Sequence, residues 1–307
     1  MDSANKQTAI IAETTQGTTP STPAFKLVRD TRVSGSPQRQ RTRSPERRSD
    51  RMAAAMVKGL TSYPKAIELA WARDAALDIL LESVFCGAFA SDILLNASTK
   101  RPFTLEEKYE GGVTDPYRRL VGCLVDSMSV SFRNGEAGQV SCSLKAMAET
   151  AATTAIASAT YAAPTPGYDP STPADIVVND CFGVSSPKLM GVQFTISNSM
   201  REQHGFGSTD PFGIGLGLFD VSGQVQFYFN ASADYSAFMT PQSALTLDLT
   251  IGATTLFKDR LVFPNCDVWN PDVDDPGATG DHMVTLHFMA KYQAAATAAA
   301  KITRLVA

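Results

Sequence analysis

The chain has 307 residues, 44% of them hydrophobic and 19% charged, with a formal net charge of −4. This composition is typical of a globular protein, and the negative balance disfavours a dedicated nucleic-acid binder, which usually carries a large basic excess. No stretch approaches the ~20 consecutive apolar residues of a membrane helix, and the N-terminus lacks the basic start and apolar centre of a secretion signal. We therefore expect no membrane insertion by this chain, and synthesis in a cytoplasm.

The cysteines favour a reducing compartment. They are odd in number and widely spaced, which is unlike a disulfide framework and indicates buried thiols. The five positions are Cys86, Cys123, Cys142, Cys181 and Cys266.

The first distinctive segment is QRQRTRSPERRSDR, at residues 38–51. Its six arginines are Arg39, Arg41, Arg43, Arg47, Arg48 and Arg51. Alone, such a run is typical of a disordered basic arm that binds nucleic acid. An acidic segment near the C-terminus offsets it, with Asp267, Asp272, Asp274, Asp275 and Asp281. A chain that has one basic and one acidic segment can bind copies of itself.

The next segment, KAIELAW at residues 65–71, alternates apolar residues with others and predicts a half-buried antiparallel strand. Its apolar face carries Ile67, Leu69 and Trp71. A short amphipathic helix should follow, with Asp74 as its N-cap. The apolar face of this helix comprises Leu77, Leu80, Leu81 and Val84.

The same pattern recurs in the second half of the chain. In QVQFYFN, the residues Val225, Phe227 and Phe229 stand 158 positions after their counterparts in the first strand (225 − 67, for example). A second predicted helix follows at the same offset, with Ser232 or Asp234 near its start. Its apolar face comprises Tyr235, Phe238 and Met239.

A closing strand repeats as well, at an offset of 144 (284 − 140). The first copy has Val140, Cys142, Leu144 and Ala146, and the second has Val284, Leu286, Phe288 and Ala290. We interpret the chain as mainly β, with two tandem units that each carry one short flanking α-helix. The predicted boundaries are 1–150 for the first unit with its N-terminal arm, 151–178 for an Ala/Thr/Pro-rich linker, and 179–307 for the second unit with a C-terminal tail.

No catalytic or metal-binding constellation stands out. The histidines are His204, His282 and His287, and no zinc-ligand spacing occurs. The cluster of Asp272, Asp274 and Asp275 superficially matches a calcium loop, but it lacks the sixth-position glycine and the distant glutamate, and a solvated acidic turn is the alternative. The glycine-rich stretch at residues 213–223 fits no phosphate-binding loop. We expect no cofactor, no metal and no enzymatic activity.

A long segment of the second half, VQFTISNSMREQHGFGSTDPFGIGLGLFDVSGQVQFYFNASADYSAFM, has a recognisable order of pieces. A strand ends in Ser/Asn-Asn, an arm carries a Gly-Ser pair, a glycine precedes an x-V-x-F-Y-F strand, and a Tyr-x-x-Phe helix follows. This order resembles the major tail tube proteins of long-tailed, siphophage-type bacteriophages. AETTQGTTPSTPAF, RSDR and PFTLEEKYEGG in the first half look similar to the same family.

The resemblance implies that each unit is a small antiparallel β-sandwich or half-barrel. It implies a structural subunit of the virion tail, assembled in the host bacterial cytoplasm into stacked rings around a lumen through which DNA passes during ejection. The implied partners are further copies of the chain, the tape measure, tail-terminator and tail-tip proteins, and DNA in transient, non-specific passage. Single-copy relatives form six-membered rings, so the doubled copy here suggests trimeric rings with pseudo-sixfold symmetry.

The repeat also predicts the structure of the first part of the basic segment. At the 158-residue offset, residues 34–43 fall on residues 192–201, so this part should be a strand and the start of an arm. In related tubes the arm reaches the neighbouring ring, and arginine suits bidentate pairing with carboxylates across such an interface. The candidate inter-ring residues are Arg39, Arg41, Arg43, Arg47, Arg48, Arg51, Arg201 and Glu202. DNA contact in the lumen and a plain solvated loop are the alternatives.

A capsid or other coat protein that binds the genome through the arginine run is the alternative function. Such a protein should place a disordered basic arm before a single jelly-roll core. Here the run lies inside a repeated strand pattern and the total charge is acidic, which favours the tube subunit.

Overall fold

The computed structural model describes residues 5–52, 55–110, 114, 116–164, 176–229, 235–252, 257–274 and 280–306. Strands dominate it, which confirms the predicted mainly β fold. The elements of the first half are β1 (Lys6–Ala12), β2 (Ala24–Leu27), β3 (Asp30–Ser34), β4 (Gln38–Arg43), β5 (Met56–Ala70), α1 (Ala75–Phe85), β6 (Ile93–Leu95), β7 (Phe103–Tyr109), β8 (Tyr117–Arg133), β9 (Gln139–Ala146), β10 (Ala148–Ala152) and β11 (Thr160–Ala162). Those of the second half are β12 (Ile176–Cys181), β13 (Leu189–Ser197), β14 (Arg201–Gln203), β15 (Gly213–Gly215), β16 (Asp220–Tyr228), β17 (Gln242–Ile251), β18 (Phe257–Asp274), β19 (Met283–Ala290) and β20 (Lys301–Val306).

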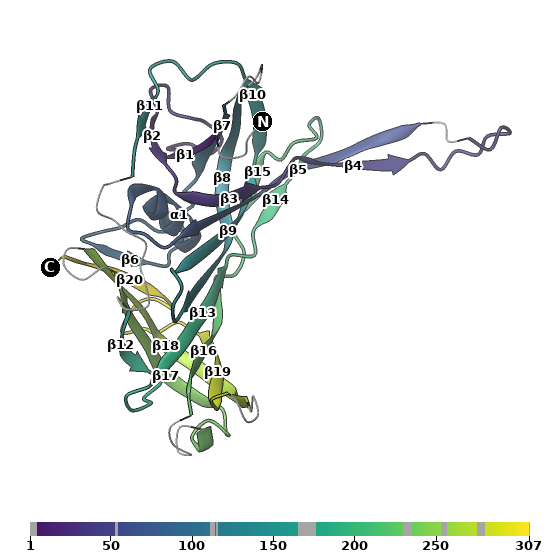
Figure 1. Cartoon of the computed structure of the whole chain (residues 1–307). Coiled ribbons are helices and arrows are strands. Elements are labelled where there is room, and N and C mark those ends of the chain that lie inside the picture. The colour runs from purple at the N-terminus through teal and green to yellow at the C-terminus, as the bar shows by residue number, and fades with distance from the viewer. Residues whose placement is uncertain are drawn as a thin grey trace.

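One antiparallel sheet, which we call the main sheet, runs through both halves of the chain (Figure 1). Its strand order is β3, β5, β9 and β8 in the first half, followed by β13, β16, β19 and β18 in the second. Hydrogen bonds between β8 and β13 therefore join the two halves edge to edge.

A second layer covers one face of the main sheet in each half. In the first half, the N-terminal part of β8 pairs with β10 and β7, and the layer continues through β1 and β2 to β11, which pairs with β2 in parallel. In the second half, the N-terminal part of β18 pairs with β17 and β20, which in turn pair with β12 and β6. The apolar core lies between these layers.

The alternation of apolar and polar residues along the strands decides which face is buried. The predicted core positions of β9 and β19 are all buried, as are Ile67, Leu69 and Trp71 at the end of β5 and Val225 and Phe227 on β16. The C-terminal part of β5 and the strands β9, β16 and β19 therefore turn one face to the core, and the opposite face is mostly polar, with Met289 of β19 exposed on it.

Helix α1 lies between the layers of the first half and begins where the sequence predicts. The Asp74 side chain accepts hydrogen bonds from the backbone N–H groups of Ala76 at 3.0 Å and Leu77 at 2.8 Å. Such a cap satisfies two N–H groups that have no partner within the helix. The predicted second helix falls partly on residues 230–234, outside the described part of the chain, while Tyr235 and Ser236 are helical and a turn follows.

The register of the main sheet refines the internal repeat. Val33 of β3 faces residue 67 of β5, and Val192 of β13 faces residue 225 of β16. Because 67 and 225 are counterparts, Val33 corresponds to Val192, at an offset of 159 (192 − 33) rather than the expected 158. A ladder irregularity occurs at the matching place in both pairs, before Arg32 and before Gly191. The one-residue difference therefore lies between β3 and β5, not within the strands.

The predicted division of the chain at residues 150 and 178 remains a prediction. Part of the segment expected to be a linker forms β11, and β12 begins at Ile176. Residues 165–175 of that segment lie outside the described residues. In the described part of the chain, no helix is long and apolar enough to span a bilayer.

Candidate assembly surfaces

A two-stranded hairpin formed by β4 and the N-terminal part of β5 projects from the body (Figure 1), and we call it the arm. Gln38 at the start of β4 faces Ser62, whereas Ser34 at the end of β3 faces Ala66. Both steps, from 34 to 38 and from 66 to 62, are four residues long, so β3 and β4 pair with β5 in the same register. The strand predicted to lead into an arm at residues 34–43 is thus present in two pieces, the end of β3 and all of β4, and residues 35–37 between them lie outside any strand.

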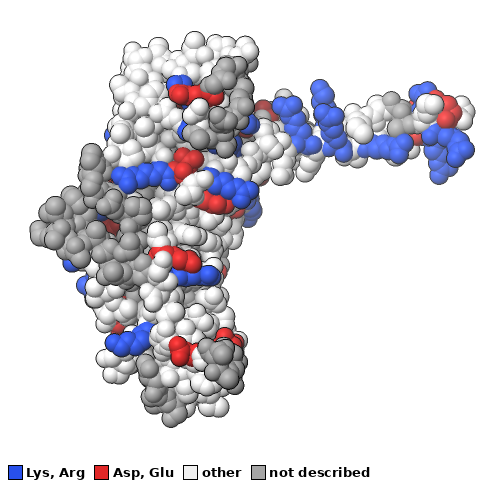
Figure 2. Space-filling model, in the orientation of Figure 1, with Lys and Arg blue, Asp and Glu red and all other residues white. Residues whose placement is uncertain are grey.

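Basic side chains are spread along the length of the arm (Figure 2). Arg39, Arg41 and Arg43 alternate along β4 and are exposed, and Arg41 faces Lys58 directly across the hairpin. Like charges at opposing positions repel each other. Among the described residues, none forms an ion pair with these three arginines or with Lys58. The arm thus presents unpaired cations that an anionic partner would stabilise.

The tip of the arm differs from its shaft. Arg48 donates hydrogen bonds to the Asp50 carboxylate, at 2.9 Å from Nη2, while Arg47 and Arg51 are exposed. Apolar side chains are exposed here as well, with Met52 at 69% and Met56 at 66%. The tip therefore offers apolar contact area in addition to charge.

A second hairpin, formed by β14 and β15, occupies the equivalent place in the second half, between β13 and β16. Its loop holds the base of the arm: the Thr61 N–H donates to the Thr209 carbonyl at 2.9 Å, and the Tyr63 hydroxyl donates to Asp210 at 2.8 Å. These contacts bring the two predicted arms side by side, although they are far apart in the sequence.

The predicted residues of the second arm lie on β14. Arg201 is exposed, whereas Glu202 is half-buried and lies 3.5 Å from His204 Nε2. Phe206 and Phe212 of the same hairpin are exposed. The second arm is thus less basic and more apolar than the first.

The open face of the main sheet is rich in hydroxyl and amide side chains. Ser127, Ser129 and Ser131 of β8 lie beside Ser197, Thr195 and Gln193 of β13. The Ser129 and Thr195 hydroxyls form a hydrogen bond of 2.9 Å across this junction. This face was not predicted from the sequence, although the DSMSVSF alternation at residues 126–132 could have indicated it.

Two edges of the main sheet stay open at its ends. Among the described strands, β3 pairs only with β5, and residues 269–274 of β18 pair only with β19. Open edges expose unpaired backbone N–H and C=O groups and invite pairing with another chain. The edge at β3 continues into the basic arm, whereas the edge at β18 carries Asp272 and Asp274, both exposed.

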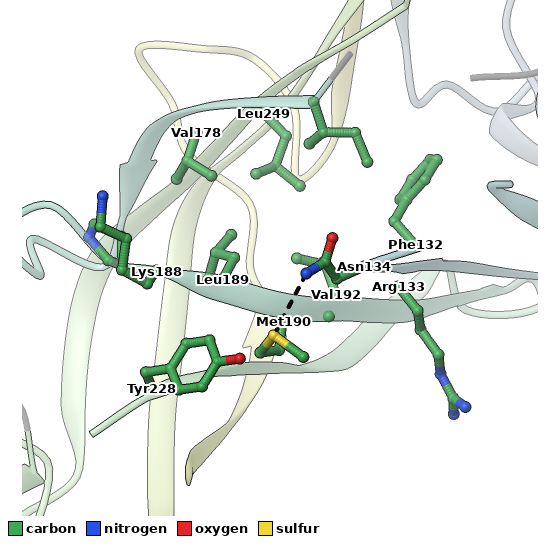
Figure 3. A pocket seen from close by; sticks show the side chains of 13 residues that line it. Phe132, Arg133, Asn134, Val178, Lys188, Leu189, Met190, Val192, Tyr228 and Leu249 are labelled. Carbon is green, nitrogen blue, oxygen red and sulfur yellow. Dashed lines mark hydrogen bonds between the residues drawn. The ribbon is translucent and has the colours of Figure 1, made fainter. Parts of the chain in front are cut away.

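A largely apolar pocket of about 380 Å³ opens beside the N-terminal end of β13 (Figure 3). Val178, Leu189 and Leu249 line it, with Tyr228 and Phe132 at its sides. Among the described residues that line it, Arg133 and Lys188 are the charged ones, and both are basic. It lies at the end of the strands opposite to the end from which both hairpins project.

The five cysteines lie in the core, whereas Asp275 of the acidic cluster lies outside the described residues. All five cysteines are free and buried, as predicted, and burial raises the pKa of Cys86 to about 11. Buried thiols with raised pKa values are poor nucleophiles. No group of metal-ligating side chains occurs among the described residues.

Nearly the whole chain is similar to a known protein family. A family model described as "Phage tail tube protein" matches residues 3–301. A search of curated proteins finds no match.

Proposed function

The chain belongs to the phage tail tube protein family, and on this basis we propose that three copies close into a ring and that rings stack into the tail tube. The family is structural, and the chain is a subunit of the virion tail.

The observation that carries the proposal is the β8–β13 junction. It joins two four-strand sets into one uninterrupted sheet and leaves one open edge at each end. If each half of the chain is one tube unit, this junction would hold two units side by side, as neighbours in a ring. Three such chains would supply six units, with pseudo-sixfold symmetry and no open edge left over.

The polar face of the main sheet is the surface that would line the lumen. Its centre carries serine, threonine and glutamine side chains, which offer DNA phosphates no fixed positive charge. Phosphate contacts made by Lys and Arg add salt-dependent affinity. A hydroxyl- and amide-rich wall would therefore let DNA pass during ejection without holding it.

The arm would join successive rings. It projects from one end of the strands, and its cationic side has no intramolecular partner among the described residues. Carboxylates on the adjacent ring would satisfy Arg39, Arg41 and Arg43, by the bidentate pairing that guanidinium groups favour. The tape measure protein in the lumen, and the terminator and tip proteins at the two tube ends, complete the proposed set of partners.

Negative-stain microscopy of the purified protein tests this function. Tubes are the expected result. Closed shells would instead support a coat protein that binds the genome through its basic arm, and dispersed particles at all protein concentrations would contradict self-assembly.

A further inference from the structure

The two open edges of the main sheet are chemically unlike, and the internal junction shows how such edges fit. We propose that the β18 edge of one copy pairs antiparallel with the β3 edge of a second copy, in the register that places Asp274 opposite Ser34 and Asp272 opposite Ser36. This inference rests on the proposed function and deepens it, because it names the surface and the register by which one chain joins the next.

The alignment of β18 with β8 follows from their partner strands, because β18 pairs with β19 and β8 pairs with β9. On β8, Ser129 and Ser131 face residues 141 and 139 of β9. On β18, Asp272 and Asp274 face residues 285 and 283 of β19. Since β9 and β19 are counterparts at an offset of 144, Asp272 occupies the place of Ser129 and Asp274 that of Ser131.

The alignment of β3 follows in the same way. Ser34 faces residue 66 of β5, and Gln193 faces residue 224 of β16, which are counterparts at an offset of 158. Residues 35–37 lie outside any strand, but the register is the same on both sides of them, because Gln38 on β4 faces Ser62. Ser34 therefore occupies the place of Gln193, and Ser36 that of Thr195.

The internal junction pairs these places directly. Ser131 faces Gln193, and Ser129 faces Thr195. Replacing each residue by its counterpart gives Asp274 opposite Ser34, and Asp272 opposite Ser36. The proposed contact between chains is thus the internal junction repeated at the open ends.

The side chains at the open ends are suited to this register. Inside the chain, two hydroxyl groups share a hydrogen bond at the Ser129–Thr195 pair. At the open ends, the Ser36 hydroxyl would donate to the Asp272 carboxylate, and a hydrogen bond to an ionised acceptor is roughly twice as strong as a neutral one. No described residue forms an ion pair with Asp272 or Asp274, so both carboxylates are available.

Charge also makes the contact directional. Exposed Arg39 and exposed Arg32, which lies 3.9 Å from the Glu68 carboxylate, flank the β3 edge. Two β18 edges would oppose carboxylates, and two β3 edges would oppose guanidinium groups, so only unlike edges attract. Contacts of this head-to-tail kind generate rings when the rotation closes. Pro37 and Pro271, each at its edge, would limit pairing with unrelated strands.

Paired surface cysteines test the register. Because all five native cysteines are buried, an introduced pair would be the accessible one. The in-register variants are Ser34→Cys with Asp274→Cys, and Ser36→Cys with Asp272→Cys. The matched control, Ser34→Cys with Asp272→Cys, is displaced by two residues, where the diagonal separation of roughly 7–8 Å exceeds what a disulfide spans. Tubes of each variant are treated with a mild oxidant and run on a non-reducing denaturing gel.

We expect both in-register variants to give a ladder that ends at three chains, and the displaced control to give at least tenfold less cross-linking. Tubes without a ladder from either in-register variant, or with equal cross-linking in the control, would overturn the register and leave the tube function intact. Absence of tubes from the unmodified protein, seen by microscopy, would reject the proposed function and this inference with it.

Discussion

A fully buried glutamate links the two layers of the first half. Glu107 on β7 contacts Lys65 on β5 and lies 2.5 Å from Lys6 Nζ on β1. Burial alone would raise the pKa of Glu107, but hydrogen bonds and charge from Lys6 and Lys65 hold it below its ordinary value of 4.5. Charges of this kind are stable in a core only as a complete set.

Removing one member should therefore cost much of the stability of the protein. Glu107→Ala would leave Lys65, whose side chain is 2% exposed, as a buried charge without its partner. We expect the free energy of unfolding in urea to fall by about 3–5 kcal/mol at neutral pH. Because the folded pKa is depressed, this contribution is present above pH 4.5 and is lost as the pH falls through the folded pKa. Glu110→Ala, which breaks only the exposed pair with Lys108, should cost less than about 1 kcal/mol, and equal losses would contradict this account.

Asp259 has the opposite pH dependence. Burial raises its pKa to about 6, against the influence of Arg73 and Arg304, which lower it. The folded protein then binds a proton more tightly than the unfolded chain, so stability is lost as the pH rises from about 4 to about 6. Relative to Asp259→Asn, which cannot ionise, the parent should lose up to about 3 kcal/mol over this range, from ~1.36 kcal/mol per pKa unit. Urea unfolding of both proteins at several pH values measures the difference, and a constant difference would be the contrary result.

At the scale of elements, the repeated strands were predictable because their core-facing parts alternate buried apolar residues with exposed or half-buried ones. The faces of β5, β9, β16 and β19 and the cap of α1 follow from local patterns that tertiary contacts reinforce. The pairing of β8 with β13 was not predictable, because hydrophobic alternation fixes the face of a strand and not its neighbour. The contact between the two hairpins, through Tyr63 and Asp210, likewise depends on residues 147 positions apart.

The equivalence of the two halves can be tested in the core. Leu69 and Phe227 are counterparts, at 4% and 0% exposure. Changing either to Asp would bury an unpaired charge, and we expect each variant to lose several kcal/mol or fail to fold. Gln224→Asp, on the exposed face of β16, is the matched control and should keep nearly the parental melting temperature. A heat-resistant Leu69→Asp or Phe227→Asp protein would show that the assigned face is wrong.

The arm can be tested separately from the fold. Arg39, Arg41 and Arg43 are exposed, so changing all three to Ser should leave the melting temperature of the monomer within a few degrees of the parent. If the cationic side joins rings, the triple variant should form fewer and shorter tubes at low salt. Sedimentation and microscopy measure this, with Lys188→Ser at the far end of the strands as a control for lost positive charge. Unchanged tube yield across a range of salt would exclude the arm from assembly.

At the scale of the whole molecule, the main sheet has the features that our proposal requires of one segment of a closed ring. Among the described strands, it is continuous across both halves, largely polar on one face, and open at β3 and β18. The basic arm and the second hairpin leave from one end of its strands, and the apolar pocket lies at the other (Figures 1 and 3). The open edges, the hairpins and the pocket are thus three separate surfaces of the main sheet.

The central claim is that one chain supplies two neighbouring units, so that three chains close each ring. A cryo-EM reconstruction of the assembled tube tests it most directly, because the internal β8–β13 junction and the junctions between chains alternate around the ring. The account predicts threefold symmetry, with three complete chains per ring and with β3 of each chain beside β18 of the next. Six complete chains per ring, with one half of each lining the lumen and the other outside, would contradict it.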